Sequence, residues 1–210
     1  MNELLEVYNL DNTLIGTQNR GEFNNDARKE FEEKGTISKK VKTVRILLMS
    51  SNGRIYLQKR SELKNENSNL YDKTVGGHVV AGNTFELTVV KECAEELGFP
   101  ATVLSEKEFE QAVKSIDLKI VGVFKKVDHI PNFNSVRILK DGKSFIQPSM
   151  SDIYIGYYDG AIRFADGESS GVETFSINQL KNDIINNPNK FTEDLKFMVE
   201  KYSNLLVPIS

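Results

Sequence analysis

The sequence predicts an α/β fold in which strands and helices alternate along the chain and a small β-hairpin precedes the main domain. Residues 41–61 read as two strands around Ser51-Asn52-Gly53, and this turn sequence between apolar runs is a strong hairpin signal. Residues 76–99 read as a glycine turn that leads into an amphipathic helix. Further strand and helix patterns follow, and such an order indicates a sheet with helices packed on it.

The first 40 residues are predicted to form an extension. Residues 3–16 have the pattern of a hairpin that turns at Asp11-Asn12. Residues 17–40 are polar and charged, and a short helix is expected at 24–33. The expected parts of the chain are a hairpin with a bridging segment, residues 1–40, and the main domain, residues 41–210.

After the glycine turn, residues that end helices, form turns or cap helices indicate the bounds of the remaining elements. Pro100 ends the amphipathic helix. Asp141-Gly142 is expected to turn a pair of strands, and Thr192 to cap the last helix. The expected strands are 118–127, 134–140 and 143–157, and the expected helices are 105–116, 177–186 and 191–205.

Three carboxylates, Glu92, Glu95 and Glu96, lie within five residues of the amphipathic helix. At about 100° per residue they share an arc roughly 100° wide. A solvated acidic face and a Mg²⁺ or Mn²⁺ site both fit this pattern, because hard cations take carboxylate oxygens and share their other positions with water and phosphate. The apolar stripe on the other side is expected to consist of Leu87, Val90, Ala94 and Leu97.

The residues before the helix favour the metal site. Gly76, Gly77 and Gly82 allow close approach of the backbone, which a site for pyrophosphate would use. Asn83 is expected to cap the helix, with Glu86 as its capping-box partner.

These residues resemble the signature of the Nudix hydrolases, which act on a nucleoside diphosphate linked to another moiety. The signature is G, five residues, E, seven residues, then R-E-U-x-E-E-x-G-U, where U is bulky and apolar. In this chain it runs from Gly77 to Phe99 with its spacing intact. Asn83 stands where the family has glutamate, and Lys91 where it has arginine. The resemblance implies an α/β/α sandwich with a mixed sheet.

The resemblance also implies an activity, the Mg²⁺-dependent hydrolysis of a pyrophosphate linkage in a small-molecule diphosphate. Glu92 and Glu96 would bind Mg²⁺ or Mn²⁺, Glu95 would be a further ligand or orient water, and the Gly77 carbonyl would complete the shell. Some members place an extra ligand or a base in a late loop, where this chain has Glu168. An ordinary turn carboxylate is the alternative for Glu168.

Three residues are expected to bind substrate, namely Gly77, Arg60 and His78. Arg60 ends the strand that resembles the family's basic strand, and a guanidinium can bind phosphate with two hydrogen bonds. A surface charge is the alternative for Arg60. His78 is expected to be a loop residue near the pocket.

Within the family, the chain looks similar to the subgroup of type 1 isopentenyl-diphosphate isomerase. Such an isomerase would need a cysteine near Gly76 and histidines before the first core strand, whereas residues 35–45 contain no histidine. Isomerase activity is therefore not expected. The alternative to a hydrolase is a non-catalytic Nudix-fold nucleotide-binding module. Asn83 and Lys91 leave room for it, and the three helix glutamates argue against it.

Composition limits the partners. The net charge of −3 argues against nucleic acid, and no apolar run approaches the ~18 residues of a membrane span. The single cysteine, Cys93, excludes an internal disulfide, is read as a packing residue and suits a cytoplasmic location.

Analogy with relatives allows a homodimer, with the N-terminal hairpin as a candidate contact. Residues 61–72 and 128–150 are expected to select the substrate, and Phe133 and Phe145 in the second segment are compatible with a stacked base.

Overall fold

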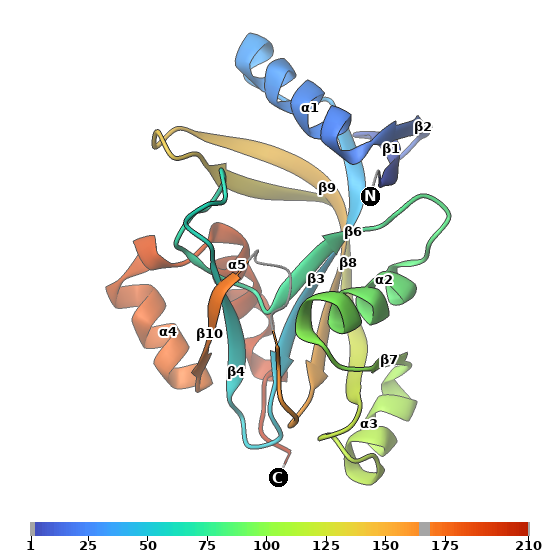
Figure 1. Ribbon diagram of the computed structural model, residues 1–210, viewed down its shortest axis with the longest axis vertical. Coiled ribbons are helices and arrows are strands. Elements are labelled where there is room, and N and C mark those ends of the chain that lie inside the picture. Colours follow the sequence, from blue (N-terminus) through green and yellow to red (C-terminus); the bar gives the residue numbers. More distant parts are fainter. Residues whose placement is uncertain (1–2, 164–168, 210) are drawn as a thin grey trace.

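The computed structural model describes residues 3–163 and 169–209, and within them the chain forms a curled mixed sheet between helices (Figure 1). The strands are β1 (Leu4–Asn9), β2 (Leu14–Asn19), β3 (Lys39–Met49), β4 (Ile55–Arg60), β5 (Tyr71–Asp72), β6 (Val75–His78), β7 (Ala101–Leu104), β8 (Gly122–Ile138), β9 (Ser144–Tyr157) and β10 (Ser169–Phe175). The helices are α1 (Arg20–Lys34), α2 (Phe85–Glu92), α3 (Glu106–Ser115), α4 (Ile177–Asn186) and α5 (Glu193–Tyr202), and a π-helical turn, Cys93–Leu97, continues α2.

Strand β3 lies at the centre of the sheet. The main path of the sheet runs β10-β4-β3-β9-β8-β7. β3 pairs in parallel with β9 from Val41 to Met49, and antiparallel with β1, β4 and β6. The expected mixed sheet is therefore confirmed.

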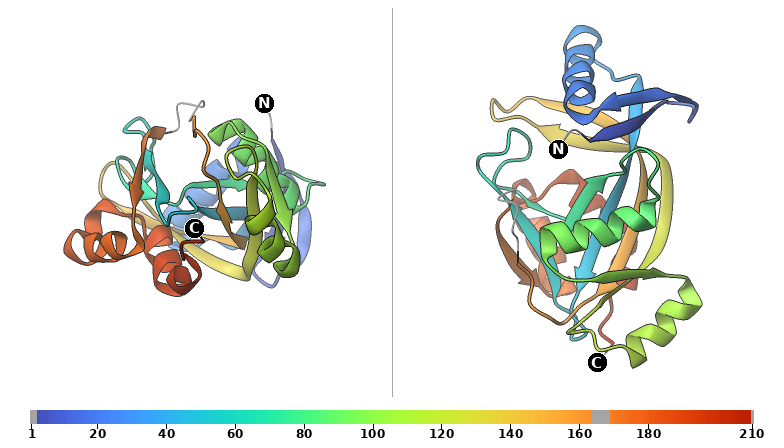
Figure 2. Two further views of the ribbon diagram at one scale, coloured as in Figure 1. Left: turned by 90° about the horizontal axis from the view of Figure 1, so that it is seen from below. Right: turned by 45° about the vertical axis from the view of Figure 1, so that its right-hand side comes forward.

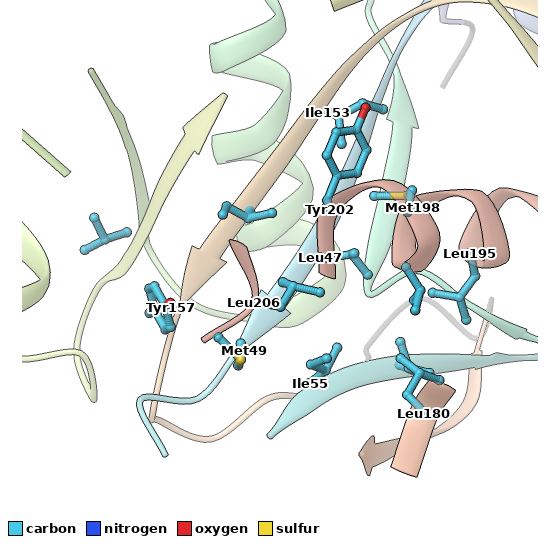
Figure 3. Close-up of a cluster of buried hydrophobic side chains, with 14 of the residues drawn as sticks. Leu47, Met49, Ile55, Ile153, Tyr157, Leu180, Leu195, Met198, Tyr202 and Leu206 are labelled. Atoms are coloured by element: carbon cyan, nitrogen blue, oxygen red, sulfur yellow. The ribbon is translucent and has the colours of Figure 1, made fainter. Parts of the chain in front are cut away.

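The two faces of β3 carry different side chains, because successive residues of a strand point to opposite sides. Val44, Ile46 and Leu48 are buried with residues of α2. Leu47 and Met49 point the other way and pack with residues of α4 and α5 (Figure 3). Figure 2 shows α2 on one side of the sheet and α4 with α5 on the other. This is the α/β/α layering that the resemblance implied.

The N-terminal hairpin forms as predicted, and β1 also pairs with β3. Helix α1 is longer than the expected 24–33. Its cap is Asn19, whose side chain accepts a hydrogen bond from the amide of Gly21, and Gly35 ends it with a φ of 72°. The helix lies above the long β8–β9 ribbon at the top of the molecule (Figure 1). The division into domains at residue 40 stays a prediction.

Two expected elements differ in the structure. One strand, β8, replaces the two expected at 118–127 and 134–140. Irregularities in its pairing with β9, at Lys126/Asp128 and at Ile130/Phe133, interrupt the alternation from which the strands were predicted. The turn expected around Gly76 and Gly77 is instead strand β6. In the described part of the chain, none of the helices combines the length and the apolar character that crossing a bilayer requires.

Candidate active site

Helix α2 begins one residue later than predicted. Thr84 is its cap, and the Thr84 hydroxyl accepts a hydrogen bond from the amide of Leu87 at 3.1 Å. The amide of Asn83 donates to the carbonyl of Val80 at 2.9 Å and so closes the preceding turn. The capping prediction for Asn83 is therefore wrong, although the helix is capped by a side chain.

The buried face of the helix also differs from the predicted stripe. Val89, Cys93 and Leu97 have fully buried side chains, and they lie on one row with a spacing of four residues. Leu87 is 43% exposed and Ala94 is exposed, so both were wrongly placed in the stripe. Leu97 was correctly predicted. Glu92, which precedes Cys93 of this row, lies against Gly77 of β6.

The helix widens where the last two glutamates lie. The amide of Gly98 donates to the carbonyl of Cys93, five residues earlier, and Gly98 has a φ of 76° that favours glycine. Glu95 and Glu96 are part of this π-helical turn, whereas Glu92 ends the regular helix. Single π-helical turns of this kind occur frequently at functional sites.

The structure brings the three predicted carboxylates together. Burial raises the pKa of Glu92 to about 7, and the charge of Glu95 acts in the same direction. Glu92 also shares a hydrogen bond with Glu96, which opposes that rise. Glu95 is exposed, and the other two are half-buried. The three carboxylates of the helix therefore interact with one another instead of standing as separate surface charges.

Gly77 lies directly against this cluster. A Cβ atom built on Gly77 would stand 1.7 Å from Oε1 of Glu92, so any side chain here would displace the carboxylate. Gly76 faces the other side of β6, where a Cβ atom would stand 2.5 Å from Cε of Lys73. The two glycines therefore place bare backbone between the glutamates and the space on the far side of the strand.

That space is a cavity of about 290 Å³. Among the described residues, seven lysine and arginine side chains line it, and Glu66 is the single carboxylate. Both predicted substrate-binding residues, Arg60 and His78, line the cavity, as does Gly77. The segments 61–72 and 128–150 also border it.

Buried carboxylates hold the basic side chains of the cavity floor. Asp194 Oδ2 lies 3.2 Å from Nε of Arg45. Asp72 Oδ2 lies 3.0 Å from Nζ of Lys73 and 3.5 Å from a terminal nitrogen of Arg60. Burial opposes ionisation of Asp72, but the charges of Lys73 and Arg60 outweigh it and hold the pKa of that carboxyl well below its usual range. The floor cations are therefore fixed in place.

His78 is the last residue of β6, so its assignment to a loop is wrong. Burial lowers the pKa of His78 to about 3, and the charges of Arg20, Arg137 and Arg45 act in the same direction. The ring is consequently neutral near pH 7 and can both donate and accept a hydrogen bond.

Sequence reasoning missed most of the basic side chains of the cavity. Arg45 carries a signal that could have revealed it, because it is a single charge inside the apolar run from Val44 to Met49. Arg20, Arg28 and Arg137 come from segments far apart in the sequence and carry no such signal.

The chemistry of the acidic cluster fits a hard divalent cation. Glu92, Glu95 and Glu96 offer oxygen ligands only, and a bound cation would offset both the burial and the charge of Glu95 that raise the pKa of Glu92. In the described residues, no group of three or more His, Cys, Asp or Glu side chains is arranged so that it could hold a metal ion. The carboxylates would therefore have to turn toward a common point. Glu168, the predicted additional ligand or base, lies outside the described residues.

The family model of the NUDIX domain matches residues 39–195. The chain belongs to this family. Isopentenyl-diphosphate Delta-isomerase of Serratia proteamaculans (strain 568) is 23% identical over 192 residues, which cover 91% of this chain and 87% of that protein. Membership of the Nudix family supports the expectation of a pyrophosphohydrolase.

Solved structures confirm the Nudix fold. DR0079 from Deinococcus radiodurans matches with a TM-score of 0.62 at 18% identity, over 95% of this chain and 98% of that one. A bifunctional NMN adenylyltransferase/ADP ribose pyrophosphatase from Francisella tularensis, complexed with AMP and Mn ion, matches with a TM-score of 0.53 at 16% identity. That match covers 89% of this chain and 47% of the other.

The cysteine of this Nudix chain does not reach the cavity. Cys93 is the only cysteine in the sequence, its side chain is fully buried, and burial raises the pKa of its thiol. Gly76 occupies the place where the isomerase subgroup would need a cysteine. The likeness to an isomerase therefore does not extend to the thiol chemistry of that subgroup.

Proposed function

We propose that the chain is a Nudix hydrolase that uses Mg²⁺ or Mn²⁺ to cleave the pyrophosphate linkage of a nucleoside diphosphate derivative or a related small-molecule diphosphate. The contact between Gly77 and Glu92 carries this proposal, because it joins an acidic cluster to a basic cavity through bare backbone. A site for a metal-bound diphosphate needs both kinds of charge within reach of each other.

In this proposal Glu92 and Glu96 bind the cation, Glu95 binds it or orients water, and the Gly77 carbonyl is a further ligand. When bound, the cation would neutralise charge on the diphosphate and would lower the pKa of a water molecule bound to it. Glu168 remains a candidate for an additional ligand or the base. The presence of Mn ion in the Francisella tularensis structure supports testing Mn²⁺ beside Mg²⁺.

The cavity side chains orient the substrate. Arg60, Lys73 and Arg45 lie on the floor and offer charged donors to the diphosphate oxygens. Asp72 and Asp194 hold these donors, so little ordering is needed when substrate binds. Neutral His78 adds a hydrogen bond without adding charge. Water attacks one phosphorus, the P–O bond of the pyrophosphate breaks, and two phosphorylated products leave.

The test is hydrolysis of a panel of nucleoside diphosphate derivatives with Mg²⁺ or Mn²⁺, read by mass spectrometry. Glu96→Gln should lower turnover by several orders of magnitude and leave the circular dichroism spectrum unchanged. Glu110→Gln, on the exposed side of α3, is the matched control and should retain wild-type turnover. Near-wild-type turnover in Glu96→Gln would refute the proposal.

A second candidate is a nucleotide-binding module without hydrolysis. The absence of a preformed metal-holding group in the described residues favours it, together with Lys91 in place of the family arginine. Calorimetry with ADP-ribose distinguishes the two candidates. Binding by the wild type without product formation, in the presence of metal, would favour the module.

The setting and the assembly state are also proposals. The single cysteine supports a reducing, cytoplasmic setting. For a homodimer the contact would be the N-terminal hairpin, where Leu14 and Ile15 on the edge strand β2 are 54% and 50% exposed. Light scattering after size-exclusion chromatography tests this, and Leu14→Lys should shift a dimer toward the monomer.

A further inference from the structure

Among the described residues, the cations on the floor of the cavity outnumber the carboxylates that pair with them. On its floor, Lys73 and Arg60 share one carboxylate, Asp72. Arg45 forms an ion pair with Asp194, whose Oδ2 also lies 4.0 Å from Nζ of Lys73. Arg137 makes no ion pair with the described residues, and its charge acts on both Arg45 and Lys73. An anion that enters here therefore meets cations beyond those already paired.

Two guanidiniums at the rim have donors without a partner. The Nε atoms of Arg28 and Arg137 are shielded from solvent and have no hydrogen-bond partner in the described part of the chain. Arg28 is tied by its terminal nitrogen to Oε1 of Glu66 at 2.7 Å, which orients the guanidinium. A buried donor that lacks an acceptor costs stability, and such groups occur where a ligand supplies the acceptor.

The two rim arginines come from different parts of the molecule. Arg28 lies on α1 and Arg137 on the β8–β9 ribbon, and both side chains line the same cavity. Figure 1 shows α1 above this ribbon. The family match begins at residue 39, so α1 lies outside the matched region. One side of the cavity rim is thus supplied by a segment that precedes the region matched by the family model.

Among the described residues, the lining of the cavity is dominated by charged side chains rather than by phenylalanine or tyrosine rings that would stack a nucleobase. No ring of either kind lines it in the described part of the chain. Phe133 and Phe145, which the sequence suggested for stacking, are each 5% exposed. Phe133 packs on the guanidinium of Arg45 at 3.9 Å from the ring centre, and Phe145 packs against Phe31. A volume of about 290 Å³ is at the small end for ligand cavities.

We propose that the cavity takes a compact substrate that carries a second phosphate group besides its diphosphate, and that Arg28 and Arg137 bind this second phosphate. The proposal rests on the proposed hydrolase and names its substrate class. The diphosphate lies beside Gly77 on the cavity floor, and the second phosphate accepts hydrogen bonds from the rim guanidiniums. A phosphorylated sugar diphosphate has this form, whereas a simple nucleoside diphosphate places an uncharged base at the rim.

The experiment compares 5-phosphoribosyl 1-diphosphate with ADP, each with Mg²⁺. Both carry a diphosphate, and they differ in whether a phosphate or a base lies at the other end. Wild-type kcat/KM should be at least about tenfold higher for the first compound. Arg137→Gln and Arg28→Gln should each lower that value by about 10- to 100-fold, mainly through KM, because each removes hydrogen bonds to a charged group. For ADP the same variants should change kcat/KM by less than about threefold.

The matched controls are Lys140→Gln and Lys29→Gln, which remove one exposed charge from the same ribbon and the same helix. Both should behave as the wild type. If ADP is cleaved as well as the sugar diphosphate, or if the arginine variants lower both activities equally, the substrate proposal is overturned and the hydrolase stands.

If neither compound is cleaved, the hydrolase proposal fails for these substrates, and calorimetry without metal decides the cavity assignment separately. Binding of 5-phosphoribosyl 1-diphosphate that is tighter than that of ADP and weakened by Arg137→Gln supports the second phosphate site. Equal or undetectable binding of the two compounds overturns it.

Discussion

Replacement of Gly77 by alanine tests whether the bare backbone between helix and cavity positions the acidic cluster. The added Cβ would stand 1.7 Å from Oε1, 2.3 Å from Cδ and 3.0 Å from Cγ of Glu92, whereas ordinary contact begins at 3.4 Å. The carboxylate must therefore move by more than about 1 Å, and a misplacement of that size can cost about 10²-fold in rate. We expect kcat to fall by about 10²-fold.

The cost to stability should be much smaller than the cost to activity. The displaced atoms are the end of a flexible side chain, and a strained rotamer costs about 0.5–1.5 kcal/mol. For a chain of this size each 1 kcal/mol lowers Tm by about 2–4 °C. Thermal unfolding should therefore show a fall of a few degrees at most, with a circular dichroism spectrum like that of the wild type.

A double-mutant cycle with Glu92→Ala decides whether the effect passes through Glu92. If it does, Gly77→Ala should cost little further activity or Tm once the carboxylate is gone, because the clashing atoms are absent. Equal losses in both backgrounds would refute the reasoning, since alanine at residue 77 would then act on something other than Glu92.

The remaining predictions concern the supports of the site. Asp72→Asn should lower the free energy of unfolding by about 3–5 kcal/mol, measured with urea, because it leaves Lys73 and Arg60 without their buried partner. Since the native pKa of Asp72 is depressed, its contribution is present above the unfolded value of about 3.9 and is lost as pH falls below it. Wild-type stability should thus fall more steeply than that of Asp72→Asn below about pH 4, and parallel curves would contradict this. Cys93 should resist thiol reagents in the native protein and react only on unfolding, since its side chain is fully buried; rapid native labelling would contradict this. Gly98→Ala should cost about 1–2 kcal/mol of stability in a urea titration, because its φ of 76° is left-handed; an unchanged midpoint would contradict this.

The sequence predicted those parts of the site that local spacing determines. Glu92, Glu95 and Glu96 lie close together because they occupy successive turns of one helix, and the hairpin at Ser51-Asn52-Gly53 fixes where β4 begins. The helix stripe was mispredicted at Leu87 and Ala94, because the row that packs is chosen by the sheet beneath the helix. Periodicity within a helix cannot show that choice.

The cavity could not be predicted in the same way. Its basic side chains come from α1, β3, β4, β8 and the loops between them, and only the folded sheet brings them together. Asp194 is a clear example, since it pairs with Arg45 across almost 150 positions of sequence. In the sequence, Asp194 is a carboxylate in the first turn of a helix, where it stabilises the positive end of the helix dipole. Its ion pair with Arg45 is visible only in the tertiary structure.

The alternation along β3 also has a consequence for folding. Its odd-numbered side chains include Arg45, which needs Asp194, while Val44 and Ile46 enter the apolar layer under α2. A slip of one residue against β9 would turn the guanidinium to the face packed under α2, away from Asp194, and would turn an apolar side chain of β3 toward Asp194. Because an unpaired buried charge is heavily penalised, misaligned chains would be strongly disfavoured during assembly. Arg45, which we assign to substrate binding, therefore also favours one register of β3 against β9.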